Sequence, residues 1–94
     1  VGDFNAVPGD PGDETLRRIT SGLSLNRAMP DTTQHAGTYP GDDPKRLIDH
    51  IFYATERIVP IGTRIDCGPP DAPPSDHCAV TMTFRLSGDE NNAP

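Results

Sequence analysis

A strict alternation close to the C-terminal end constrains the fold of this chain more than any other feature. Every second residue from 80 to 86 is apolar and those between are polar; the apolar positions are Val80, Met82, Phe84 and Leu86. Successive side chains of a strand point to opposite faces, so this period of two predicts a strand over residues 79–86. Asp76 and His77 come just before it, so an acid and an imidazole are expected at the start of a rigid element.

The remaining sequence predicts short elements separated by loops. Asp10 as N-cap, followed by Pro11 at the first helical position, predicts the start of a helix, and Gly22 predicts its end. The apolar stripe of this helix consists of Leu16, Ile19 and Leu23. Further strands are expected over residues 37–39, 47–53 and 62–67, and a polar tail over 87–94.

Composition limits the size of the core and the kinds of partner. With 94 residues, including 9 Gly and 11 Pro, the chain is expected to form one small domain with a thin core. The 14 acidic and 8 basic residues give a net charge of −6, and no basic stripe marks a nucleic-acid-binding surface. No apolar run approaches the length of a membrane span. The cellular compartment is left open.

The two cysteines are too few for a disulfide framework. Cys78 shares a strand face with Val80, which predicts a buried packing thiol. A disulfide with Cys67, across the proline-rich loop, stays the alternative, because its geometry cannot be judged from sequence.

Three short motifs occur in a fixed order along the chain. They are Gly2-Asp3-Phe4-Asn5, Arg46-Leu47-Ile48-Asp49-His50-Ile51 and Ser75-Asp76-His77-Cys78-Ala79-Val80. Together they resemble the last three motifs of the endonuclease/exonuclease/phosphatase (DNase I-like) superfamily, over residues 1–86. The resemblance implies an α/β fold, the C-terminal half of a two-sheet α/β sandwich that is incomplete in this chain. The N-terminal half of the same domain is then an expected partner.

The resemblance also implies a role for each polar residue of the motifs. Asp3 orients or deprotonates the attacking water, and Asn5 positions that water or a phosphate oxygen. Asp76 is a ligand of Mg²⁺, with Mn²⁺ as the alternative, since hard cations prefer oxygen ligands. His77 donates to the phosphate. Asp49 accepts a hydrogen bond from the other nitrogen of His77, which fixes the tautomer and favours the charged imidazole.

Other histidines and acids have simpler interpretations. His50 faces away from Asp49 by strand alternation and is expected to be a packing or surface residue, and His35 is expected in a solvated loop. Thr38 and Tyr39 match a small-polar-plus-aromatic pair that is common in the family here. The family's metal-binding Glu and a second catalytic His belong upstream of the first motif, outside this chain.

A calcium loop is a weaker interpretation of the first motif. Asp3, Asn5 and Glu14 match the first, third and last ligand positions of an EF-hand loop. Val7 supplies no ligand between them, and Pro8 cannot adopt the positive φ that the sharp turn requires.

Two functions follow from these patterns. The first is a metal-dependent phosphoester hydrolase, either a nuclease or phosphodiesterase or a phosphatase, which acts on nucleic acid or a small phosphoester. This enzyme is expected to be active only with the missing N-terminal half. The alternative is a truncated or cleaved fragment that serves as a non-catalytic binding or structural piece. Residues 1–94 alone are expected to be inactive and to be partly unfolded, aggregated or tied to another chain.

Overall fold

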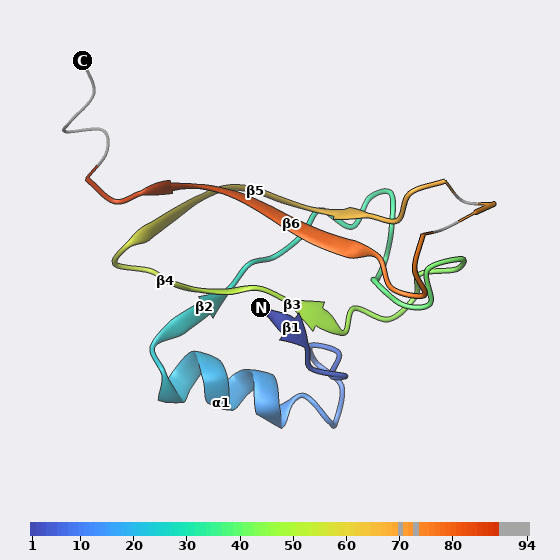
Figure 1. Ribbon diagram of the computed structural model, residues 1–94. Coiled ribbons are helices and arrows are strands. Elements are labelled where there is room, and N and C mark those ends of the chain that lie inside the picture. The colour runs from blue at the N-terminus through green and yellow to red at the C-terminus, as the bar shows by residue number, and fades with distance from the viewer. Residues whose placement is uncertain (70, 73, 89–94) are drawn as a thin grey trace, which may run out of the picture.

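The computed structural model describes residues 1–69, 71–72 and 74–88. Within these residues the protein is a mainly-β domain with one short helix (Figure 1). The elements in order are β1 (Gly2–Asp3), α1 (Glu14–Gly22), β2 (Leu25–Arg27), β3 (Asp49–His50), β4 (Phe52–Ala54), β5 (Ile58–Asp66) and β6 (Ala79–Leu86). The strands form three two-stranded antiparallel sheets: β1–β3, β2–β4 and β5–β6.

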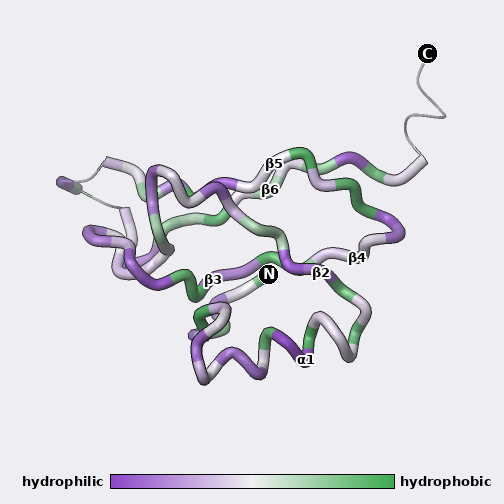
Figure 2. The backbone as a smooth tube through the Cα atoms, turned by 180° about the vertical axis from the view of Figure 1, so that it is seen from behind, coloured by the Kyte–Doolittle hydropathy of each residue, from purple (hydrophilic) through white to green (hydrophobic). Residues whose placement is uncertain are grey.

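The elements are arranged in layers. The sheets β1–β3 and β2–β4 lie between helix α1 on one side and the β5–β6 pair on the other, in both Figure 1 and Figure 2. The described residues form a small mainly-β domain with one short helix, and they do not form a clear two-sheet α/β sandwich of the kind expected. In the part of the chain that the structure describes, the strands pair in twos and do not assemble into two broad sheets.

The predicted strand over 79–86 is confirmed, with the same bounds, as β6. Its partner β5 begins at Ile58, earlier than the prediction of 62–67. The register shifts between Pro60 and Gly62, as in a β-bulge. Because proline has no N–H to donate to a ladder, such an irregularity allows the strand to continue through Pro60.

The predicted strand over 47–53 is present as two pieces rather than one. β3 pairs with β1, while β4 pairs with β2, and Ile51 separates the two. The carbonyl of Ile51 accepts a hydrogen bond from the Ala28 amide at 2.8 Å. The strand predicted over 37–39 is wrong, since only an isolated bridge between Tyr39 and Arg46 is formed there.

Helix α1 begins later than predicted. Its N-cap is Asp13 and not the predicted Asp10. Asp10 belongs to the turn before the helix, where its carbonyl accepts a hydrogen bond from the Asp13 amide at 3.0 Å. Asp13 also accepts a hydrogen bond from the Gly9 amide at 2.7 Å, so this side chain organises the turn before the helix. Leu16 is the buried residue of the helix, and Leu23, just past its end, is exposed. Hydrophilic and hydrophobic residues alternate along α1, as in a helix that packs with one face (Figure 2).

The core is small, as the composition predicts. A buried cluster of Ile65, Cys67 and Cys78 packs against Leu47 at the end of the β5–β6 pair. Cys67 and Cys78 form a disulfide, so the prediction of a free packing thiol is wrong, although Cys78 is buried. Among the described residues, no helix has the length and apolarity to cross a membrane. The predicted tail falls largely outside the described residues, which end at Gly88.

Candidate active site

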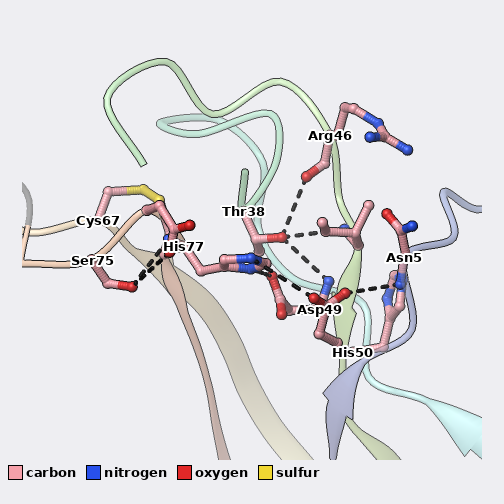
Figure 3. A network of polar contacts seen from close by, with 12 residues as sticks. Asn5, Thr38, Arg46, Asp49, His50, Cys67, Ser75 and His77 are labelled. Atoms are coloured by element: carbon pink, nitrogen blue, oxygen red, sulfur yellow. Dashed lines mark hydrogen bonds and ion pairs between the residues drawn. A yellow bond between two sulfur atoms is a disulfide. The ribbon is translucent and has the colours of Figure 1, made fainter. Parts of the chain in front are cut away.

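Three side chains from distant parts of the chain meet at one place. His77 Nδ1 lies 2.8 Å from Asp49 Oδ2, and His77 Nε2 lies 3.8 Å from Asp3 Oδ2. One potential ligand atom from each of these residues lies within 4.8 Å of the other two. Figure 3 shows the imidazole of His77 pointing at Asp49. The hydrogen bond predicted between Asp49 and His77 is confirmed, and we call Asp3, Asp49 and His77 the acid–histidine cluster.

Strand pairing places the two acids of the cluster. Asp3 and Asp49 are directly opposite one another in the antiparallel β1–β3 ladder. Side chains at such positions lie close together on one face, and two like charges there repel. His77 comes from the segment just before β6, and its ring contacts both carboxylates. A charged imidazole therefore compensates two negative charges that the ladder forces together.

The surroundings of His77 favour its protonated form. The hydrogen bond to Asp49 is the largest cause that raises the pKa of His77 above its ordinary value of 6.5. Partial burial acts against this, and the charges of Asp49, Asp3 and Asp76 raise the pKa further. Because Asp49 binds Nδ1, the protonated ring keeps its second N–H, on Nε2, on the side of Asp3.

Asn5 lies at the end of the same motif and acts on Asp3 through its backbone. The Asn5 amide donates to Asp3 Oδ1 at 2.9 Å, and Asn5 has a positive φ of 50°. This turn holds Oδ1 of Asp3 by a hydrogen bond, and the other carboxylate oxygen, Oδ2, lies on the side of His77. The side chain of Asn5 is exposed beside the cluster.

Asp76, the predicted metal ligand, is next to the cluster but not a member of it. Its carboxylate is exposed and accepts a long hydrogen bond of 3.4 Å from the Ser75 hydroxyl. Its backbone carbonyl accepts the Gly41 amide at 2.7 Å, which fixes the chain at this point. An exposed carboxylate with free oxygen lone pairs fits a hard cation that retains most of its water. One exposed carboxylate outside the acid–histidine cluster does not distinguish a metal ligand from a solvated acid, so the Mg²⁺ ligand stays a prediction.

The two interpretations of His50, packing or surface, can be compared with the structure. His50 is 2% exposed, and its Nε2–H donates to the Ala6 carbonyl at 2.8 Å. The prediction of a packing histidine is confirmed, and the surface alternative is wrong. Its ring lies near Phe4 and Phe52, and burial is the main cause that lowers the pKa of His50.

The calcium-loop interpretation finds no support in the geometry. Glu14 pairs with Arg18 at 2.9 Å in the first turn of α1. It is not part of the cluster formed by Asp3, Asp49 and His77.

Sequence reasoning undervalued one aromatic residue. The ring of Tyr39 packs against the ring of His77, with centroids 4.9 Å apart and planes tilted by 49°. The signal available in the sequence was only the Thr38-Tyr39 pair. Its importance comes from a contact across the loop, which spacing does not predict.

Two hollows of the protein differ in their relation to the candidate site. One of about 260 Å³ lies beside β1, β3 and the start of β6, and its lining includes Asp3 and Asp49. A larger hollow of about 510 Å³ is lined by residues such as Asn26, Tyr53 and Ile61, and it contains none of the predicted site residues.

Comparison with known proteins found no match to this chain among family models, curated proteins or solved structures.

Proposed function

We propose that this chain carries part of the active site of a metal-dependent phosphoester hydrolase of the endonuclease/exonuclease/phosphatase type. The observation that carries the proposal is the 2.8 Å hydrogen bond between Asp49 and His77, with Asp3 facing the other ring nitrogen. These residues come from the three motifs that resemble the family. An acid, an oriented imidazole and a second acid can supply the proton transfers that hydrolysis of a phosphoester uses.

Each residue has a distinct role in the proposed reaction. His77 donates from Nε2 to a phosphate oxygen, and Asp49 holds the ring in the orientation that keeps Nε2 on the side of Asp3. Asp3 accepts a proton from, or orients, the attacking water with Oδ2. Asn5 supplies its exposed amide to the water or to a phosphate oxygen. A cation such as Mg²⁺ or Mn²⁺, held in part by Asp76, neutralises phosphate charge when bound.

We also infer that the domain is completed by an N-terminal half of the same sandwich. Large apolar side chains on β5 and β6 support this, since Ile61 is 63% exposed and Phe84 and Leu86 are each 50% exposed. Faces of this kind are covered by a second sheet in a sandwich. The hydrolase is proposed to act only when that covering sheet is present.

The test is hydrolysis of bis(p-nitrophenyl) phosphate with Mg²⁺ by the full-length protein. His77→Ala and Asp3→Ala are expected to lower kcat by about 10²- to 10⁴-fold, the usual contribution of a positioned acid or base. His35→Ala is the matched control and is expected to leave kcat unchanged. Chelation of the metal is expected to abolish turnover. A His77→Ala protein with near-normal turnover would remove His77 from the mechanism.

A substrate panel separates the hydrolase classes. Turnover of duplex DNA would support a nuclease, and turnover of a phosphomonoester such as an inositol phosphate would support a phosphatase. The net charge of −6 favours a small phosphoester over long nucleic acid.

The second candidate is a non-catalytic binding or structural piece. The same exposed side chains on β5 and β6 favour it, because apolar surface of this kind also marks protein–protein contacts. Absence of turnover on every phosphoester, together with stable association with another polypeptide, would favour this function over the hydrolase.

A further inference from the structure

Thr38 is fully buried, and its hydroxyl group is saturated with hydrogen bonds. Its side chain is the largest with 0% exposure among the described residues. The hydroxyl accepts from the amides of Ile48 at 3.2 Å and Asp49 at 3.3 Å, and it donates to the Arg46 carbonyl at 3.3 Å. One donor and two acceptors are all that a hydroxyl offers, so all of them are used on backbone groups of residues 46–49, the segment that leads into β3.

The backbone of the same residue binds the other half of the Asp49–His77 pair. The Thr38 carbonyl accepts the amide of Cys78, the residue after His77, at 2.7 Å. Figure 3 shows Thr38 between Arg46 and Asp49 on one side and His77 on the other. A single residue therefore connects the segment of the acid to the segment of the imidazole.

Neighbouring residues keep this segment close to both partners. A Cβ atom on Gly37 would approach the backbone of Arg46 to 2.5 Å, and one on Gly41 would approach the Ser75 carbonyl oxygen to 2.4 Å. Only glycine allows such close approach. Tyr39 adds its ring contact with His77.

The hydroxyl is what distinguishes Thr38 from an apolar residue of the same shape. Valine has nearly the same shape as threonine, and burying a hydroxyl is unfavourable unless its hydrogen bonds are made. Here all three hydrogen bonds are made to the backbone of residues 46–49. The hydroxyl therefore fixes the backbone position from which the Asp49 side chain extends.

We propose that Thr38 is the positioning residue of the Asp49–His77 pair: its hydroxyl holds the backbone of Asp49 while its carbonyl holds that of Cys78. The geometric part of this proposal is independent of the reaction. Its consequence for turnover rests on the proposed hydrolase function.

The experiment compares three substitutions in the full-length protein with ¹⁵N-labelled histidine. Thr38→Val removes the hydroxyl and keeps the shape, Thr38→Ala removes both, and Thr38→Ser keeps the hydroxyl. The readout is the downfield proton resonance of His77 Nδ1–H, which reports the hydrogen bond to Asp49. Leu16→Ala, a buried change in α1, is the control for a general loss of stability.

Thr38→Val and Thr38→Ala are expected to lose this resonance, Thr38→Ser to restore it, and Leu16→Ala to retain it. The same two variants are expected to lower kcat by up to about 100-fold with little change in KM, as expected when a reacting group is displaced by about 1 Å.

Two outcomes would overturn the proposal. One is a wild-type His77 resonance in Thr38→Ala or Thr38→Val, and the other is an equal loss in Leu16→Ala. Absence of turnover in the unmodified protein would reject the hydrolase function, while the resonance would still decide the role of Thr38.

Discussion

His77 Nδ1 lies 2.8 Å from Asp49 Oδ2, although 28 residues separate them along the chain. The bond joins β3 to the segment before β6, and Asp3 completes the arrangement from β1. The candidate active site therefore depends on three chain segments being held together.

Asp49→Asn is expected to lower the pKa of His77 toward its ordinary value of 6.5. The substitution keeps the size of the side chain and removes the charge and the strong acceptor that raise this pKa. Histidine titration by NMR measures the change. Asp43→Asn, an exposed acid paired with Lys45, is the matched control and is expected to leave the His77 pKa unchanged. A His77 pKa that stays raised in Asp49→Asn would contradict the assigned cause.

His50 is expected to make the protein less stable in acid. Because burial lowers the pKa of His50 in the folded state, the unfolded chain binds a proton more readily. The contribution to the free energy of unfolding is fully present above the unfolded pKa of 6.5 and is lost as the pH falls through the lower folded value.

Chemical denaturation of wild type and His50→Gln between about pH 5 and pH 8 tests this prediction. Glutamine keeps an N–H donor but cannot be protonated, so the variant is expected to lack the acid loss that His50 causes. His77 contributes with the opposite sign in both proteins, since its raised pKa stabilises the fold below 6.5 and loses effect as the pH rises through the folded value. Equal slopes in both proteins would exclude His50 as the source.

Opening the disulfide between Cys67 and Cys78 is expected to cost about 3 kcal/mol of the free energy of unfolding, from the entropy of an unconstrained loop. These residues are 11 apart in sequence and belong to the small core. Denaturation with and without reductant measures the loss. In the control, Cys67→Ala combined with Cys78→Ala, reductant should have no effect; a reductant-independent stability in wild type would contradict the prediction.

Residues 1–94 are expected to bind Mg²⁺ only weakly. Asp76 supplies one exposed carboxylate, and Mg²⁺ loses water reluctantly. In the acid–histidine cluster, the nitrogen of His77 and an oxygen of Asp49 are already bonded to each other. Isothermal titration calorimetry is expected to show no tight Mg²⁺ site. A micromolar affinity would contradict this prediction and would show that more acids than Asp76 bind the ion.

The local sequence pattern predicted the elements whose conformation follows from the spacing of apolar residues along the chain. The alternation from Val80 to Leu86 was sufficient for β6, because one apolar face per strand follows from the period of the backbone. The same alternation turned His50 away from Asp49 but left a packing and a surface position open, and the structure buries it. Helix α1 was found but its start was misplaced, since Asp10 and Asp13 carry similar capping signals and only the turn between them decides which one is used.

The motifs predicted a candidate site of Asp3, Asn5, Asp49, Asp76 and His77. The structure brings Asp3, Asp49 and His77 into one cluster and confirms the bond between Asp49 and His77, while Asp76 lies outside that cluster. Only the tertiary structure decided how they are held. The break of the predicted strand at Ile51, the disulfide, and the burial of Thr38 between Asp49 and Cys78 all depend on contacts between residues far apart in sequence. Such contacts have no local period or spacing, so a sequence read residue by residue carries no physical signal for them.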